Sequence, residues 1–221
     1  MEDILMNKRI FGVGINDATY KTRIRTKTKG IEKTLWECPF YKRWVSMLNR
    51  VYNSSKSKCP TYEGCSVCEE WLTFSNFKAW MEQQDWEGKH LDKDLLVYNN
   101  KVYSPETCIF IPASLNSCLV SLKQRNSNKK LPIGVDLVST KNMKSEPMKP
   151  YRARCTVDGT HIDLGTYHTK ESAHKAWQIF KVKSLQNMLI SEDYSDEIAH
   201  ALQNIINTLE YEIANNIITG S

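Results

Sequence analysis

The chain has 221 residues, 41% of them hydrophobic and 25% charged, and a net charge of +5 at pH 7. This size allows one large domain or two small ones, and the absence of an apolar run of about 18 residues excludes a transmembrane helix. The cysteines are odd in number and irregularly spaced, which favours a reducing cytoplasm over a disulfide framework, and the first residues lack the layout of a signal peptide.

Charge is distributed unevenly along the chain. Residues 1–125 hold 19 Lys and Arg against 14 Asp and Glu, residues 126–183 hold 11 against 5, and residues 184–221 hold none against 6. Two basic parts, with net charges of +5 and +6, are thus followed by an acidic part of −6. The excess within residues 126–183 indicates a polyanionic partner such as nucleic acid.

The first part, residues 1–35, carries cations at every second position. They are Lys21, Arg23, Arg25, Lys27 and Lys29. An extended segment would place them on one side, where they suit a phosphate backbone, with Arg23 and Arg25 as DNA contacts. The alternative is a solvated edge strand that its charges protect from pairing.

Residues 36–125 form the next part and begin with a helical pattern over 36–58. Its apolar positions are Trp36, Phe40, Trp44, Met47, Leu48 and Val51. A second helix is expected from about Ser75, which can act as its N-cap. Between the two helices, Cys65 and Cys68 have the spacing of a zinc knuckle, but the chain holds no second such pair, so buried thiols are the preferred interpretation.

A hairpin followed by a helix is predicted within residues 88–122: a strand over 90–95, a turn at Asn99–Asn100, a strand over 107–111 and a helix from about residue 113. The first strand holds four polar or charged residues, His90, Asp92, Lys93 and Asp94. Strand interiors seldom carry so many. A metal site, a nucleic-acid surface and a solvated hairpin all fit this pattern.

Residues 126–133 are predicted to be a linker, and residues 134–190 a compact unit of three strands and one helix. Asp158–Gly159 is a strong hairpin signal, and Thr169 is a suitable N-cap for the helix. Residues 191–221 contain a further acidic helix over 195–215 with an apolar stripe, capped by Ser195. The sequence therefore predicts an α+β fold.

Period-two alternation identifies the outward face of this sheet. Tyr151, Ala153, Cys155 and Val157 would face the helix. The residues that then point away are Arg152, Arg154, Thr156 and His161, and they are the predicted DNA-binding face. Lysines of the preceding loop, Lys141, Lys144 and Lys149, would contact phosphates.

Residues 134–183, including YRARCTVDGTHIDLGTYHTKESAHKAW, closely resemble the DNA-binding domain of plant ethylene-response factors and its phage relatives, an integrase-like fold. Residues 36–122, including VCEEW, LDKD and YSPETC, resemble the HNH-type ββα modules that phages attach to such domains. The resemblance implies a phage HNH endonuclease-like protein in the cytoplasm of an infected bacterium, with its sheet in the DNA major groove.

The resemblance also implies a nuclease site. Asp92 and Asn116 stand at the positions of the two metal ligands, for Mg²⁺ or Mn²⁺, and Thr107 stands where the family has asparagine. Lys93 replaces the base histidine; as an ammonium it is a poor base and would hold the scissile phosphate. His90 is the candidate replacement base.

Two functions remain open from the sequence. One is a metal-dependent endonuclease that binds and cleaves duplex DNA. The other is a DNA-binding regulator or blocking factor whose nuclease fold has lost its chemistry; inhibition of a host protein through the acidic helix is a third, weaker alternative. The expected partners are double-stranded DNA, a second copy of the chain paired through the C-terminal helix, and a host protein, but no membrane.

Overall fold

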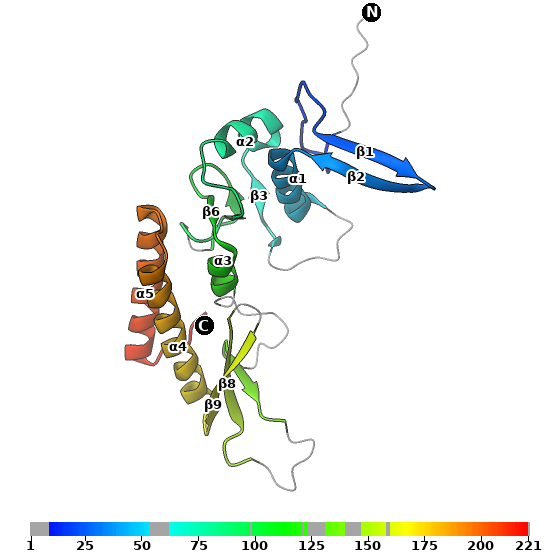
Figure 1. The fold of residues 1–221 in the computed structure, drawn as a ribbon. Coiled ribbons are helices and arrows are strands. Elements are labelled where there is room, and N and C mark those ends of the chain that lie inside the picture. Colours follow the sequence, from blue (N-terminus) through cyan, green and yellow to red (C-terminus); the bar gives the residue numbers. More distant parts are fainter. Residues whose placement is uncertain are drawn as a thin grey trace, which may run out of the picture. The chain divides into compact units, whose positions relative to one another are not determined.

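The computed structural model describes residues 9–53, 62–97, 99–120, 122, 131–139, 147–157 and 160–220. The fold is α+β, and the chain divides into two compact units, Met1–Ile111 and Pro112–Ser221 (Figure 1). Across the described ranges, no helix is at once long enough and apolar enough to cross a membrane.

The first unit combines short strands with two helices around an aromatic core. Its elements are β1 Arg23–Thr28, β2 Ile31–Glu37, α1 Pro39–Tyr52, β3 Ser66–Val67, the 3₁₀ helix η2 Glu70–Leu72, α2 Phe74–Met81, β4 His90–Asp92, β5 Val102–Tyr103 and β6 Ile109–Ile111. Trp44, Trp71 and Phe77 are almost completely buried in the core. The Trp44 indole N–H donates to the carbonyl of Trp71 at 2.7 Å, so this buried polar group is satisfied.

A segment near the N-terminus closes this core. Gly14 lies against α1, and a Cβ added to it would stand 2.5 Å from Leu48 Cδ1. Asp17 then accepts hydrogen bonds from the backbone N–H and the hydroxyl of Ser75, at 2.9 and 2.5 Å. The start of α2 is therefore capped by a side chain from a distant part of the chain, whereas Ser75 was expected to be the cap.

The helix predicted over 36–58 begins later than expected. Trp36 belongs to β2, and α1 starts at Pro39, which occupies the first turn where a missing N–H costs nothing. The apolar spacing that seemed to include Trp36 therefore spans a strand end and a helix. The assignment of Trp36 to the helix is wrong.

The predicted hairpin is present as the antiparallel pair β4–β6, with His90 opposite Ile111 and Asp92 opposite Ile109. β4 is shorter than the expected strand over 90–95. It ends at Asp92 because Asp92 Oδ1 accepts the N–H groups of Asp94 and Leu95, at 2.8 and 2.7 Å, and turns the chain. β5, in the connection, pairs in parallel with β3.

The second unit is a three-stranded antiparallel sheet with helices. Its elements are α3 Ala113–Val120, β7 Val135–Leu137, β8 Tyr151–Val157, β9 Thr160–Tyr167, α4 Lys170–Ser191 and α5 Asp196–Asn215. The strand order is β7–β8–β9, and α4 packs on this sheet. Thr169 caps α4 as predicted, because its hydroxyl oxygen accepts the N–H of Ser172 at 3.1 Å.

The boundary between the units lies before α3 and not after residue 125. The reason is that α3 contacts β8, and the buried Lys181 of α4 donates to the carbonyl of Cys118 at 3.1 Å. The end of the predicted linker also belongs to the core. Ile133 is buried with Trp177, and a Cβ on the neighbouring Gly134 would stand 2.1 Å from Trp177 Cδ1.

The acidic helix α5 lies beside α4 (Figure 1). Its buried positions are Ile198, Ala201, Leu202, Ile206 and Leu209. The expected apolar stripe is therefore covered within the same chain. Ser195 takes the N-cap position, but its side chain makes no capping hydrogen bond.

Candidate nucleic-acid interface

The outward face of the sheet follows from the alternation of β8. Ala153 and Cys155 are buried on the side of α4. Arg152, Arg154 and Thr156 alternate with them and are only partly buried. The predicted alternation of this strand is confirmed, and two arginines lie on the face opposite α4.

Both arginines are directed to one carboxylate on the neighbouring strand. Arg154 Nη1 lies 2.9 Å from Asp136 Oδ2, and Arg152 Nη2 lies 3.9 Å from the same oxygen. Asp136 stands directly opposite Arg152 in the β7–β8 register. Asp136 is hydrogen-bonded to Arg154, whereas the separation from Arg152 is too long for a hydrogen bond. Asp163, opposite Arg154 in the β8–β9 register, is a second carboxylate beside these arginines.

The β9 side of this face is shaped by a bulge. Arg152 pairs with Thr166 and Arg154 with Asp163, so β9 has one more residue than β8 in this interval. Gly165, with φ of +103°, takes up the extra residue, and its N–H donates to Asp163 at 2.8 Å. Asp163 is thereby held by its own strand.

The remaining predicted residues of the face are close to one another. Thr156 Oγ1 and His161 Nδ1 are 3.0 Å apart on paired positions of β8 and β9. Lys149 is exposed just before β8. Lys141 and Lys144 lie outside the described residues.

Arg23 and Arg25 lie in the first unit, on one face of β1. Arg23 forms an ion pair with Glu37, and Arg25 Nη1 lies 3.3 Å from Glu32 Oε2. Both glutamates come from β2. Each arginine is therefore already paired across the ribbon.

The predicted nuclease residues on β4 have different surroundings. His90 is exposed and Asp92 is partly buried, with its Oδ1 engaged by the turn. Lys93 is only 5% exposed, and its ammonium donates to Asp94 at 2.5 Å and to the carbonyl of Asn100 at 2.6 Å. Lys93 thus has a structural role in closing the turn, and contact with a phosphate stays a prediction.

Asn116 lies on α3 in the second unit, with His90 and Asp92 in the first. Thr107 donates to the carbonyl of Val102 at 2.8 Å within the hairpin connection. The assembly of His90, Asp92 and Asn116 into one site therefore stays a prediction.

β4 offers a carboxylate oxygen to a divalent metal. Asp92 Oδ2 makes no hydrogen bond to a described residue and is a suitable oxygen for Mg²⁺. In the parts of the chain that the structure describes, however, no group of three or more His, Cys, Asp or Glu residues could hold a metal ion. Cys65 and Cys68 are partly buried thiols, and burial raises the pKa of Cys68.

No protein-family model, curated protein or solved structure matches the chain.

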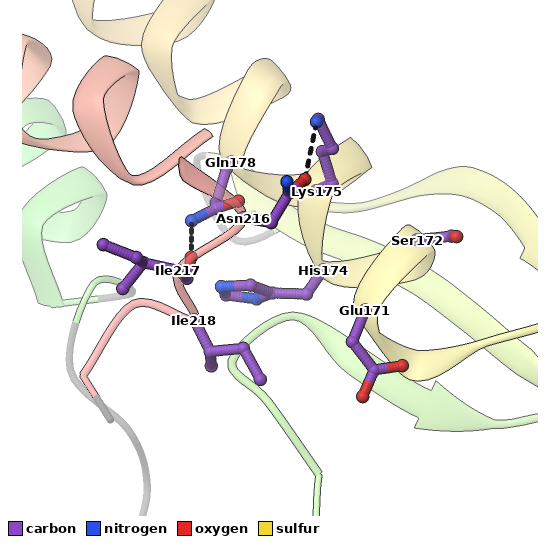
Figure 2. A pocket seen from close by; sticks show the side chains of 8 residues that line it. All are labelled: Glu171, Ser172, His174, Lys175, Gln178, Asn216, Ile217 and Ile218. Carbon is purple, nitrogen blue, oxygen red and sulfur yellow. Dashed lines mark hydrogen bonds between the residues drawn. The ribbon is translucent and has the colours of Figure 1, made fainter. Parts of the chain in front are cut away.

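A small hollow of about 110 Å³ lies elsewhere in the second unit, between α4 and the segment that follows α5 (Figure 2). It is lined by Glu171, Ser172, His174, Lys175, Gln178, Asn216, Ile217 and Ile218. Gln178 donates to the carbonyl of Ile217 at 3.0 Å, and Lys175 to Asn216 at 3.1 Å. These bonds hold the C-terminal segment against α4, and the space is small enough to be filled by a few water molecules.

Sequence reasoning missed one residue of the sheet face, Asp136. The sequence does contain a hint, because Asp136 is the one acidic residue of the run IGVDLVST, residues 133–140, which holds the first strand of the three-stranded unit. Its register with Arg152 could not be known, since a hairpin signal fixes the β8–β9 pairing but nothing comparable fixes β7 on β8.

Proposed function

We propose that the chain binds duplex DNA through the outward face of the β7–β8–β9 sheet. The observation that supports this best is the pair of arginines, Arg152 and Arg154, held around one carboxylate on the face opposite α4. Their side chains are 30% and 33% exposed, so both are accessible to a ligand. An ordered guanidinium fork is the group that reads guanine O6 and N7 in the major groove.

Charge and resemblance support the same partner. Residues 126–183 carry 11 cations against 5 carboxylates. The resemblance of residues 134–183 to ethylene-response-factor-type domains favours the major groove. When DNA binds, the arginines are expected to exchange part of their contact with the Asp136 carboxylate for contacts with base edges.

The test is a binding measurement with Arg152→Ala/Arg154→Ala. If both arginines read bases, affinity for the preferred sequence, selected from a random duplex pool, should fall by about 2–6 kcal/mol, at 1–3 for each contact. The matched control is Lys170→Ala/Lys183→Ala, which removes the same charge from α4, on the other side of the sheet. Equal losses in the two variants would show that charge alone matters and would refute the sheet as a sequence-reading surface.

Metal-dependent cleavage is a second candidate function. It is favoured by the antiparallel pairing of β4 with β6, which leaves Asp92 at a strand end with α3 next in the chain. Because Asp92 Oδ1 also closes the turn, alanine would remove a structural bond together with any metal ligand. Asp92→Asn keeps an oxygen for the turn and loses the charge, so it isolates the chemistry.

The measurement is nicking of supercoiled DNA with Mg²⁺ or Mn²⁺. An active site predicts that Asp92→Asn abolishes nicking and leaves DNA affinity unchanged, and that His90→Ala slows it by roughly 10²–10⁴. If the wild type binds DNA but does not nick it with either ion, the endonuclease proposal fails and the DNA-binding regulator remains.

A further inference from the structure

The β1–β2 ribbon has an apolar face that the described residues of its own unit leave largely exposed. The register places Ile24 opposite Trp36 and Thr28 opposite Ile31 on one side of the ribbon. Ile24, Trp36 and Ile31 are 44%, 45% and 73% exposed, and Leu35, in the bulge beside Trp36, is 63% exposed. Contiguous exposed apolar side chains of this kind mark interaction surfaces.

The tip of the ribbon is tight and narrow. Lys29 and Gly30 connect the strands with φ of +50° and +83°, the values of a two-residue type I′ turn. No heavy atom of a described residue lies within 4 Å of the place a Cβ on Gly30 would take, so this side of the turn is open among the described residues. Ile31, the first residue after it, is the most exposed apolar residue of the ribbon.

The charge of the ribbon indicates which kind of partner its apolar face would contact. Residues 21–37 hold six cations and two carboxylates, Glu32 and Glu37. Both carboxylates are paired with arginines, Arg25 and Arg23, on the other face. Around the tip, Lys27, Lys29 and Lys33 make no ion pair with any described residue. A second basic ribbon would be repelled, and a polyanion attracted.

The chemistry of the ribbon fits the minor groove of DNA once that groove is widened. Paired strands lie about 5 Å apart, so with its side chains the ribbon is wider than the undistorted minor groove of about 6 Å. The register also places Lys33 on the apolar face, opposite Thr26. This face therefore carries a cation and no carboxylate, and it suits the sugar-lined walls and the phosphates of that groove. Architectural proteins lodge such apolar wedges between base steps and kink the duplex, which also opens the groove to a ribbon.

We propose that the β1–β2 ribbon is a DNA-bending arm that enters the minor groove and lodges Ile31 between adjacent base pairs. The inference rests on the proposed DNA binding, and it adds an activity that the sheet of the second unit does not supply. The lysines at the tip hold the phosphates on either side of the groove.

The experiment measures energy transfer between dyes at the two ends of a short random-sequence duplex, alongside affinity from a gel shift. The wild type should bring the ends together by a bend of roughly 20–90°. Ile31→Ala should lose at least half of the rise in transfer, and Ile31→Leu should retain it. The matched control is Ile190→Ala, because Ile190 on α4 is 85% exposed and far from the ribbon in sequence. Lys29→Glu, at the turn, should weaken both binding and bending.

The outcomes separate this proposal from the previous one. A wild type that binds DNA and leaves it straight, or Ile31→Ala that bends DNA as well as the wild type, overturns the arm and leaves DNA binding by the sheet intact. A wild type with no affinity for duplex DNA overturns both.

Discussion

At the scale of single residues, His174 shows how the second unit stabilises its C-terminal end. The side chain is 1% exposed and stacks on Trp177 with ring centroids 5.4 Å apart. Its Nε2 accepts the N–H of Thr219 at 3.0 Å, so the proton of the neutral ring is on Nδ1, which donates to the carbonyl of Ile133 at 2.9 Å. The neutral form satisfies both neighbours, and a second proton would break the bond to Thr219.

Stability should therefore depend on pH through His174. Burial lowers the pKa of this imidazole below 6.5, and this outweighs the bond to Ile133 and the charge of Glu212, which raise it. As the pH falls, His174 of the unfolded chain is therefore protonated at a higher pH than His174 of the folded chain. The free energy of unfolding is at its full value above about pH 6.5 and decreases as the pH drops toward the lowered folded-state pKa. The thermal midpoint should decrease between about pH 7.5 and pH 5.5.

The variant His174→Gln tests whether His174 causes this pH dependence of the thermal midpoint, because glutamine does not titrate. Its midpoint should depend less on pH than that of the wild type, whereas His200→Gln, at an exposed position of α5, should behave as the wild type. Identical pH profiles for His174→Gln and the wild type would contradict the assignment.

At the scale of secondary structure elements, the contact between α4 and α5 covers the apolar side of the acidic helix. Leu202 is completely buried in this chain, and its neighbour Gln203 is exposed. The apolar positions of α5 are therefore buried within one chain, and the second copy that the sequence predicts at this helix stays a prediction.

Truncating Leu202 to alanine should lower the free energy of unfolding by about 2–5 kcal/mol, because it leaves a cavity under α5. Gln203→Ala should change it by no more than about 0.5 kcal/mol. Denaturant unfolding, followed by circular dichroism at several protein concentrations, measures both. A midpoint that rises with concentration would show that a second copy also covers the helix.

The elements that sequence predicts best here are those with a strong local signal. Thr169 predicts the start of α4, and the period-two alternation of β8 predicts which face of the sheet α4 covers. The turn after β4 was missed because it depends on one carboxylate oxygen of Asp92, and the cap of α2 because Asp17 is far away in sequence. The division before Pro112 depends on packing between α3, β8 and α4, which no local pattern encodes.

At the scale of the whole molecule, positive charge is found in both units and negative charge is concentrated at the C-terminal end. In the second unit, α5 packs on α4 and α4 packs on the sheet, so the acidic helix is not part of the arginine face. The proposed DNA-binding surfaces are therefore the ribbon in the first unit and the sheet in the second.

The salt dependence of the affinity for DNA should show which individual lysines of these surfaces contact phosphates. If Lys149 contacts a phosphate, Lys149→Ala should reduce the slope of log affinity against log salt by about 0.9 and weaken all DNA sequences equally. Lys183→Ala, on the exposed side of α4, should leave the slope unchanged. The slope is measured by fluorescence anisotropy over a series of salt concentrations, and an unchanged slope for Lys149→Ala would remove this lysine from the interface.

The burial of Lys93 limits how the first unit could be redesigned as a nuclease. In the HNH modules that residues 36–122 resemble, position 93 corresponds to the base histidine, so it is the obvious place to introduce one. Here, however, that side chain is turned inward, onto Asp94 and the carbonyl of Asn100. Histidine at this position would be an imidazole in a space shaped for a long ammonium chain, out of reach of water and substrate. Evolution or design would have to rebuild the turn after β4 before the substitution could serve any chemistry, whereas His90 already faces solvent.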